Sequence, residues 1–295
     1  EELLLFVGLL DSQNIPKDLL NQYKDQSTVD SFIYHLRKYS LITNDTSASP
    51  LSHLSIHRST QDISFVYLTE FLKLKKDSKV LKDMTNALDD YTDQAIEQED
   101  FSQMHVMAPH LEKVLHHTDV LTDFSKGLLE SKLGSIYYFI NDDKSREMLD
   151  DSLDNLQKKT LASLSPADTS RLARSFLHIG AVYTELRLYR RAEELFKKAN
   201  NIYGKEGTKN YIELSWVLTH LGNIHRRLGN YEIAKDHLEQ SVQLNKQYMG
   251  NKQRTARALG YLGSVYRGLG FYQKAIDTLR ESLAIYNKNY SNDHF

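Results

Sequence analysis

The sequence predicts an all-α protein that ends in a solenoid of repeated helical hairpins. Only 13 Gly and 4 Pro occur in 295 residues, and valine-rich strand runs of alternating polarity are almost absent. In addition, one residue pattern recurs about every forty residues near the C-terminus. Because 40% of the residues are hydrophobic and 26% are charged, the chain can bury a core and is expected to fold.

The first 75 residues predict a separate small module. Apolar periodicity and capping residues indicate helices over 3–10, 14–23, 27–40 and from about 59 onward. Asn14 is the expected cap of the second helix, with Pro16 in its first turn. Two short strands, 41–43 and 54–56, flank a turn rich in Asn, Asp, Ser and Pro. Three helices, a two-stranded hairpin and a fourth helix in this order predict a winged-helix domain over 1–75.

Residues 76–128 are expected to form a helical bridge or a degenerate repeat. Two helices, about 78–97 and 101–117, have helical apolar spacing but lack the glycine pattern of the repeats that follow. The second of them carries four histidines: His105, His110, His116 and His117. Because no carboxylate completes a ligand set at i+3 or i+4, helix packing and surface polarity explain these histidines, and no metal site is expected.

Residues 129–295 predict about four helical hairpins, the last of them truncated. Gly180, Gly222 and Gly263 recur 42 and 41 residues apart. Each glycine is followed nine residues later by a tyrosine and twelve residues later by an alanine: Tyr189, Tyr231 and Tyr272, and Ala192, Ala234 and Ala275. Two antiparallel helices cross closely where one presents Gly and the other Ala, and the tyrosine at the turn is expected to fill the gap between that pair.

Each second helix continues with an apolar stripe that one hairpin could not bury alone. Its members are Phe196, Leu238 and Leu279, then Ala199, Ser241 and Ser282, then Ile202, Leu244 and Ile285. Its helical spacing predicts packing against the next hairpin. A weaker fourth copy carries Leu133, Gly134 and Tyr137, lacks the turn aromatic, and has Ser145 in place of the alanine. Since the last stripe would be exposed, further repeats are expected in a longer parent protein.

This repeated pattern resembles the tetratricopeptide repeat. The 42-residue spacing and the linkers Ile202-Tyr203-Gly204 and Tyr248-Met249-Gly250 are similar to those of the kinesin-light-chain-like subclass. The resemblance implies an α-solenoid that binds protein partners.

The N-terminal part resembles the winged-helix segment of signalling NTPases of the NB-ARC and STAND type. The resemblance rests on the runs LLLFVGLLDSQNIPKDLL, HLRKYSLI and LSIHRSTQDI, and MAPHLEKVLHH resembles the bridge of those proteins. Its most specific element is an HRxxQ-type motif formed by His57, Arg58 and Gln61. In that family the histidine approaches the β-phosphate of ADP and holds the resting state, whereas aspartate is commoner than arginine at the position of Arg58.

For this chain the resemblance implies a nucleotide-sensing role in a parent protein that binds ADP or ATP and oligomerises on activation. His57 is the expected sensor, because an imidazole between a strand and a helix can donate an N–H to a phosphate oxygen. The alternative is that His57 caps the following helix and bonds a backbone carbonyl. Gln61 is expected to position the motif rather than to contact the ligand.

Several classes of chemistry are excluded by composition. The absence of cysteine excludes disulfides, thiol nucleophiles and cysteine-liganded zinc. The formal charge of −2, from 37 basic and 39 acidic residues, argues against a polyanion-binding module. No apolar run is long enough for a membrane span, so a cytoplasmic protein is expected. No G-x-x-x-x-G-K-[ST] run occurs, so neither nucleotide binding by this piece alone nor enzymatic activity is expected.

The repeats offer a candidate partner-binding surface, because the first helix of each unit lines the concave side of such a solenoid. The candidate residues on that side are Arg174, Trp216, Asn223, Arg226, Arg227, Arg257, Ser264 and Arg267. Arginine offers planar, multidentate donors, so the expected partner is an acidic peptide or an acidic surface of the parent's own NTPase core. The alternative is a solvated polar face on which the arginines pair with Glu185, Glu213 or Asp236.

The first functional prediction is therefore a non-catalytic regulatory and protein-interaction fragment of a signalling NTPase. Two alternatives stay open: a DNA-binding winged-helix transcriptional regulator with repeats, and a plain protein–protein scaffold. Against DNA binding, the third helix offers only His35, Arg37 and Lys38 beside Asp30, which is little basic surface for anchoring phosphates.

Overall fold

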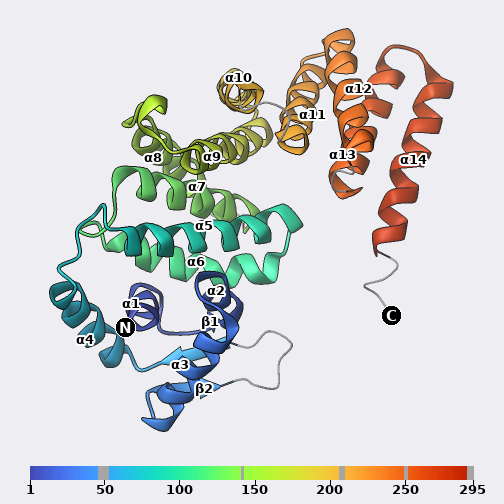
Figure 1. The fold of residues 1–295 in the computed structure, drawn as a ribbon. Helices are drawn as coiled ribbons and strands as arrows, with labels where there is room; N and C mark the ends of the chain where they lie inside the picture. Colours follow the sequence, from blue (N-terminus) through green and yellow to red (C-terminus); the bar gives the residue numbers. More distant parts are fainter. Residues whose placement is uncertain (46–52, 141–142, 206–209, 249–251, 291–295) are drawn as a thin grey trace. The chain divides into compact units, whose positions relative to one another are not determined.

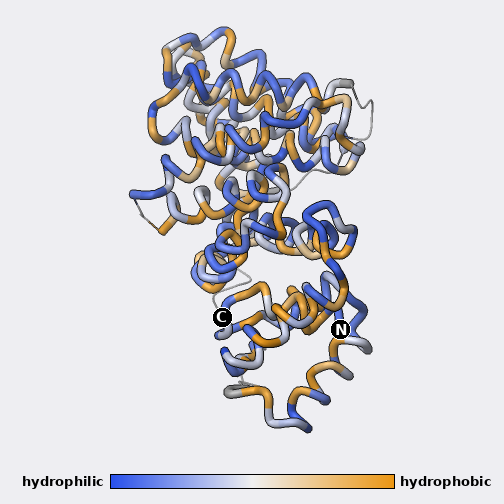
Figure 2. Tube along the Cα trace, turned by 90° about the vertical axis from the view of Figure 1, so that its left-hand side faces the viewer, coloured by the Kyte–Doolittle hydropathy of each residue, from blue (hydrophilic) through white to orange (hydrophobic). Residues whose placement is uncertain are grey.

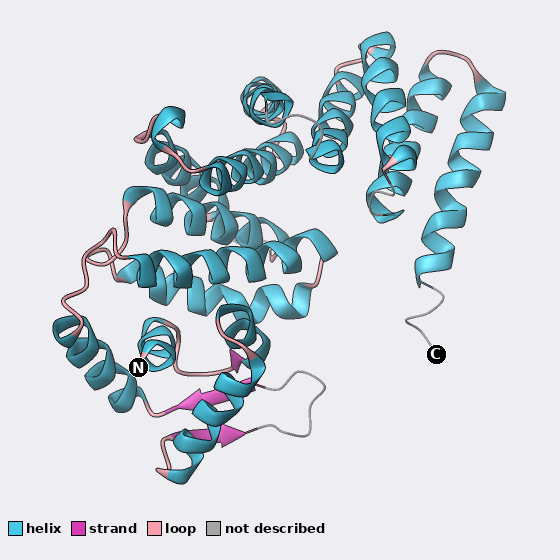
Figure 3. Cartoon of the chain, viewed as in Figure 1, coloured by secondary structure: helices cyan, strands magenta, loops and turns pink. Residues whose placement is uncertain are grey.

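The computed structural model describes residues 1–45, 53–140, 143–205, 210–248 and 252–290, and these are built mainly of helices joined by short turns, with three short strands near the N-terminus (Figure 3). The chain divides into two compact units, Glu1–Ser163 and Leu164–Phe295, each of which is described by itself. The expected boundaries after residues 75 and 128 lie within the first unit and stay predictions. Figure 2 shows apolar and polar positions alternating along the helices.

The first unit opens with helices and short strands in alternation (Figure 1). The elements are α1 (Glu2–Leu9), β1 (Ile15–Pro16), α2 (Lys17–Tyr23), α3 (Gln26–Lys38), β2 (Ile42–Asp45), β3 (His53–Ile56) and α4 (Arg58–Phe71). The strands form an antiparallel sheet in the order β1-β3-β2, with Ile15 opposite Leu54 and Ile42 opposite Ile56. Helix α4 packs on α1 where Gly8 lies against Phe65, because a Cβ on that glycine would be 3.3 Å from the Phe65 Cβ.

The expected cap at Asn14 is wrong. Ile15 and Pro16 form β1, and α2 begins only at Lys17, with Pro16 at its N-cap position. Asn14 has a φ of 54°, and its backbone N–H donates to Ser55 Oγ at 3.1 Å, which ties this segment to β3. Proline is tolerated in β1 because β1 is an edge strand. The two-stranded hairpin of the prediction is therefore a three-stranded sheet.

The first unit continues with four helices, of which the first two lie close to the predicted ranges 78–97 and 101–117. They are α5 (Lys79–Gln98), α6 (Phe101–His116), α7 (Asp123–Phe139) and α8 (Ser145–Gln157), followed by a short 3-10 helix, Leu161–Ser163. Lys132 of α7 is completely buried and forms ion pairs with two buried carboxylates of α5, Asp93 at 2.5 Å and Asp89 at 3.7 Å. Removing the lysine would take a positive charge away from these buried carboxylates.

Helices α7 and α8 form a hairpin although the sequence copy there is weak. A Cβ on Gly134 would lie 2.6 Å from Leu149 Cδ2, so only glycine allows the two helices to come so close. Ser145 Oγ donates to the Gly134 carbonyl at 2.7 Å and completes the contact. The glycine contact therefore forms without the turn aromatic that the other copies have.

The second unit consists of three such hairpins in its described residues: α9 (Pro166–Glu185) with α10 (Tyr189–Lys205), α11 (Tyr211–Arg227) with α12 (Tyr231–Gln247), and α13 (Lys252–Gly268) with α14 (Tyr272–Tyr290). In each hairpin a glycine of the first helix receives a large side chain of the second: Gly180 receives Phe196, Gly222 receives Leu238 and Gly263 receives Leu279. The first helices also contact one another, α9 with α11 and α11 with α13. Their shared surface carries the candidate site.

Two details of the repeat prediction need correction. The ring of the turn tyrosine Tyr231 lies on Gly268 of the next hairpin, where a Cβ would be 2.8 Å from Tyr231 Cζ, so its packing is not confined to its own hairpin. Part of the predicted stripe packs inside its own hairpin, since Ser241 Oγ donates to the Ser215 carbonyl and Ser282 Oγ to the Ala256 carbonyl. The helical spacing correctly predicted that these two serines are in contact with another helix, but it assigned the contacts to the next hairpin and not to their own.

Candidate partner-binding groove

The candidate groove is the surface that α11 and α13, the first helices of two successive hairpins, present on the side expected to be concave. Its centre is Trp216 of α11, which is half-buried. Two arginines of α13 lie over its ring: the Arg254 Cζ is 4.8 Å and the Arg257 Cζ 5.1 Å from the ring centroid. A cation over the face of an indole is attracted by the negative face of the ring system. The ring thus holds two positive charges at one place on the groove.

A second arginine–aromatic pair lies along the same two helices. The Arg226 Cζ of α11 is 5.3 Å from the centroid of Tyr261 of α13. Asn223 Oδ1 accepts hydrogen bonds from Arg226 Nη2 at 2.7 Å and from Nε at 3.2 Å, which fixes the guanidinium over the ring. Burial, and then the neighbouring charge of Arg227, lowers the pKa of Arg226. This crowding of positive charge would be relieved by an anionic partner.

Two of the groove arginines have acidic partners within the protein. Arg227 Nη2 donates to both carboxylate oxygens of Glu185 at 2.7 Å, and Arg254 Nη1 lies 3.4 Å from Glu213 Oε2. For these two arginines the structure shows the pairing that the polar-face alternative anticipated. Arg226 lies against the Tyr261 ring and Arg257 against the Trp216 ring, and these two arginines are the main candidates for contact with a partner.

Buried aromatic rings support Trp216 from within the protein. His220 of α11 meets Trp216 edge to face, with the ring centroids 4.5 Å apart, and stacks on Phe196 of α10 at 5.0 Å. Burial, and then the positive charges of Arg257 and its neighbours, lowers the pKa of His220 to about 3. The imidazole is therefore neutral at physiological pH and acts as an apolar support for Trp216.

The other candidate residues lie at the margins. Arg174 is half-buried on α9, and Ser264 Oγ donates to the Gly260 carbonyl of its own helix at 3.0 Å, so this hydroxyl is already engaged. Arg267 is exposed on the last turn of α13. Among the candidates, the structure thus places Arg257 against Trp216, and Arg226 against Asn223, in two separate contacts.

Sequence reasoning missed Arg254 and Tyr261. Both could have been found from helical spacing, because Arg254 lies one turn before Arg257, and Tyr261 one turn after it. Tyr261 was not among the predicted residues, although its ring lies under the Arg226 guanidinium.

The nucleotide-sensing candidates lie in the first unit, where β3 joins α4. His57 is exposed at the N-cap of α4; its backbone N–H donates to the Leu41 carbonyl at 3.2 Å, and its side chain makes no capping hydrogen bond. Arg58 is also exposed. Gln61 is buried, and its Nε2 donates to the Val7 carbonyl at 2.7 Å. Gln61 thus ties α4 to α1, whereas the His57 imidazole faces solvent.

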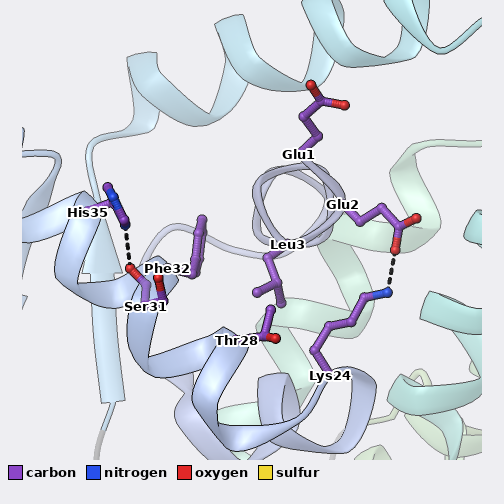
Figure 4. A pocket seen from close by; sticks show the side chains of 8 residues that line it. All are labelled: Glu1, Glu2, Leu3, Lys24, Thr28, Ser31, Phe32 and His35. Carbon is purple, nitrogen blue, oxygen red and sulfur yellow. Dashed lines mark hydrogen bonds and ion pairs between the residues drawn. The ribbon is translucent and has the colours of Figure 1, made fainter.

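A pocket of about 520 Å³ lies between α1, the segment after α2, and α3 (Figure 4). Leu3 and Phe32 supply its apolar wall. Glu2 pairs with Lys24 at 2.5 Å, and His35 Nδ1 bonds the Ser31 carbonyl at 2.7 Å. Since His35 is engaged within α3, it contributes little to a surface for nucleic acid.

The histidines of α6 have structural contacts. His110 is buried; its Nδ1 accepts from the Asp11 N–H at 3.1 Å and its Nε2 donates to the Asn14 carbonyl at 3.2 Å. Desolvation lowers its pKa to about 4. His116 bonds the Glu112 carbonyl of its own helix. Within the described ranges, no three His, Asp or Glu side chains are placed to hold a metal ion, and none of the described helices is long and apolar enough to cross a bilayer.

Comparison with known proteins identifies the repeats. Residues 171–247 and 213–288 match the family model of the tetratricopeptide repeat. The second unit therefore contains tetratricopeptide repeats, which are generally non-catalytic scaffolds for protein–protein interaction. A search of curated protein sequences gives no match.

Solved structures are similar in fold. BtubC (BKLC) from P. vanneervenii is 14% identical, with a TM-score of 0.54 over 78% of this chain and 87% of that chain. A putative kinesin light chain from Podosopora anserina is 19% identical, with a TM-score of 0.50 over 69% of this chain and 95% of that chain. Both show a mostly helical tetratricopeptide-like solenoid.

A third similar structure aligns with nearly the whole chain. It is a Signal Transduction ATPase with Numerous Domains (STAND) protein with a tetratricopeptide repeat sensor from Pyrococcus horikoshii. The identity is 16% and the TM-score 0.50, and the alignment covers 99% of this chain but only 52% of that one. This chain therefore spans about half the length of that protein, and the likeness is one of fold.

Proposed function

We propose that this chain is a partner-binding and regulatory protein whose groove between α11 and α13 captures an acidic protein segment. The observation that supports this most strongly is the pair of arginine–aromatic contacts, Arg257 over Trp216 and Arg226 over Tyr261. A guanidinium that stacks on a ring keeps its N–H donors in the plane of the group, where a carboxylate can bind in bidentate fashion. Asn223 engages only two of the five donors of Arg226.

The groove favours an acidic ligand over a neutral one. Arg226 and Arg227 are adjacent, and Arg254 and Arg257 share one indole ring, so two like-charged pairs lie on the same surface. A partner with carboxylates would offset this repulsion, and its binding should weaken as salt screens the exposed part of the interaction.

Charge reversal tests this proposal. The probe is a fluorescein-labelled twelve-residue peptide of Asp, Glu and Gly, with a Lys-and-Gly peptide of equal length as a control ligand. The double variant Arg226→Glu/Arg267→Glu should weaken binding of the acidic peptide at least tenfold, as measured by anisotropy, without lowering the melting temperature of the repeats. Arg190→Glu removes the same charge from an exposed position of α10, outside the candidate groove, and should bind normally. Equal binding by the double variant and the parent chain would sink the proposal.

We further propose that residues 1–75, the N-terminal part of the first unit, form a winged-helix control module of a STAND-type NTPase. Its helix and strand order, α1-β1-α2-α3-β2-β3, is the order of a winged helix, and the similar structure that aligns with 99% of this chain is a STAND protein. His57 is exposed at the N-terminus of α4, where the helix dipole and backbone N–H groups favour anions. A phosphate of a nucleotide held by an upstream NTPase core is the proposed ligand.

Helix α4 also offers a surface for such a core. One face packs on α1, and the opposite face exposes the apolar side chains Ile63, Val66, Tyr67 and Phe71. Apolar patches that are exposed in this way mark interaction sites on soluble proteins. Docking of the NTPase core beside His57 would cover this face.

The regulatory proposal is tested in a full-length protein that carries the NTPase core. His57→Ala should increase the ADP dissociation rate several-fold and favour the open, oligomeric form. His35→Ala, which removes an exposed histidine of α3, is the matched control and should leave ADP release unchanged. If His57→Ala retains ADP at the parental rate while the groove variant still loses its peptide, the chain is a plain scaffold.

A further inference from the structure

Helix α14, the last described helix of the repeats, exposes an apolar face, whereas the equivalent face of α12 is buried. Tyr272, Ile276 and Leu283 of α14 are 68%, 43% and 57% exposed, and Leu279, which also packs on Gly263, is 41% exposed. The positions of α12 that match Leu279 and Leu283 are Leu238 and Val242, which are 0% and 8% exposed. The difference arises because α12 is covered by the first helix of the next hairpin.

The established contact between α12 and α13 shows what such a cover requires. The Tyr231 ring lies on Gly268, where any side chain would collide with it. Leu238 and Val242 share a core cluster with Leu259 and Leu262 of α13. A polar bond completes the contact: the Tyr266 hydroxyl donates to Glu239 Oε1 at 2.7 Å. The hydrogen bond and burial together raise the pKa of Tyr266 to about 12, so this hydroxyl stays protonated.

Helix α14 repeats the apolar part of this surface and changes the polar part. Tyr272 corresponds to Tyr231, and Ile276 replaces Lys235, so the face is more apolar than that of α12. Arg280 stands where α12 has Glu239, with a side chain that is 77% exposed and only a distant i−3 contact, 4.0 Å from Asp277. On α14 the hydrogen-bond donor Arg280 therefore replaces the acceptor Glu239 of α12, so a helix that covers α14 must supply the acceptor.

We propose that α14 docks the first helix of an additional repeat hairpin whose sequence reads aliphatic-x-x-aliphatic-x-x-x-acidic-x-Gly. The two aliphatic residues take the places of Leu259 and Leu262, the acidic residue that of Tyr266, and the glycine that of Gly268. The carboxylate binds Arg280, and the glycine receives the Tyr272 ring. This surface lies on α14, outside the arginine groove, so the inference does not depend on the proposed function.

The replacement of Glu239 by Arg280 on α14 argues against a second copy of this chain as the partner that covers α14. The residues equivalent to Tyr266 in the other first helices are His225 in α11 and Tyr183 in α9, and neither is a carboxylate. A second copy would place Tyr266, His225 or Tyr183 against Arg280 and leave the charge without an acidic partner.

Helix-stapled peptides test the proposal against the full chain. They copy the 17 residues Lys252–Gly268 in three forms: unchanged, with Tyr266→Glu, and with Tyr266→Lys. Binding is measured by anisotropy. The Tyr266→Glu peptide should bind at least tenfold more tightly than the Tyr266→Lys peptide, and Arg280→Glu in the chain should reverse this order.

Two chain variants separate docking on α14 from other effects. Leu283→Asp, at an exposed position, should weaken binding of the Tyr266→Glu peptide at least tenfold, while Ile233→Asp on α12, 47% exposed and off this face, should leave it unchanged. The melting temperature should stay at the parental value in both variants. The proposal is overturned if no peptide binds, if the unchanged peptide binds most tightly, or if Leu283→Asp binds like the parent chain.

Discussion

Gly222→Ala is expected to destabilise the repeats, although alanine is the better helix former. The glycine lies where α11 crosses α12, and an added Cβ would be 2.5 Å from Leu238 Cγ and 3.2 Å from the Ala234 carbonyl oxygen. Leu238 is fully buried and cannot move aside without disturbing the packing between α12 and α13. The helices must therefore separate.

The magnitude follows from two opposing effects. Overpacking of a close contact costs about 1–3 kcal/mol, and replacement of glycine by alanine inside a helix contributes about 1 kcal/mol in the opposite direction. The net loss should be up to about 2 kcal/mol and near that upper end, since the added Cβ would be 2.5 Å from the Leu238 branch point, which is too close, and 3.2 Å from the Ala234 oxygen, which is a tight contact. Urea unfolding followed by tryptophan fluorescence measures it, because Trp216 is the only tryptophan and lies on the same helix.

Gly260→Ala is the matched control. It is also a helical glycine, in α13, but the nearest atom to its added Cβ is Ser282 Oγ at 3.6 Å, an ordinary contact. Helix propensity should therefore dominate, and the variant should gain about 0.5–1 kcal/mol. If Gly222→Ala were as stable as Gly260→Ala, the close crossing of α11 and α12 would not be what the glycine is needed for.

Three further predictions concern buried polar groups. Lys132→Ala should destabilise the first unit by about 3–5 kcal/mol, because two buried carboxylates, Asp89 and Asp93, would lose the ammonium group with which both form ion pairs; thermal unfolding by circular dichroism measures this. The low pKa of His220 means that, below about pH 6.5, the unfolded chain binds a proton at this residue and the folded chain does not. The free energy of unfolding should therefore fall by roughly 2 kcal/mol from pH 7 to pH 5. In His220→Phe, the dependence of this free energy on pH, measured by Trp216 fluorescence, should be flatter. Gln61→Leu should cost about 0.5–1.5 kcal/mol, because the Val7 carbonyl would lose the Gln61 Nε2 donor and keep the Leu10 N–H at 3.3 Å; an unchanged melting temperature would contradict this.

The hairpins could be predicted because the glycines at their closest helix–helix contacts recur at a regular spacing in the sequence. Gly180, Gly222 and Gly263 recur at a fixed spacing, and in the structure each receives one large side chain from the following helix. The neighbour that each remaining side chain meets could not be predicted in the same way. The Tyr231 ring lies on Gly268 of the next hairpin, and a period specifies which face a residue occupies but not which helix covers that face.

The N-terminal sheet shows a second limit of sequence reasoning. Pro16 after Asn14 is typical of a helix start, yet Ile15 and Pro16 pair with β3 and the helix begins later. The pairing depends on β3, about forty residues away, so no local signal could reveal it. In the candidate groove, likewise, charge patterning predicted the arginines, whereas their contacts with Trp216 and Tyr261 depend on how α13 packs beside α11.

Trp216 allows the most direct test of the central claim, that the groove of α11 and α13 binds an acidic partner. Its fluorescence should change in a saturable way when the acidic peptide is titrated into the full chain, because the ring lies between Arg254, Arg257 and His220. We predict that the change is lost in Arg257→Glu and reduced by added salt, and that the Lys-and-Gly peptide produces none. A flat titration in the parent chain, or an equal response to both peptides, would contradict the account.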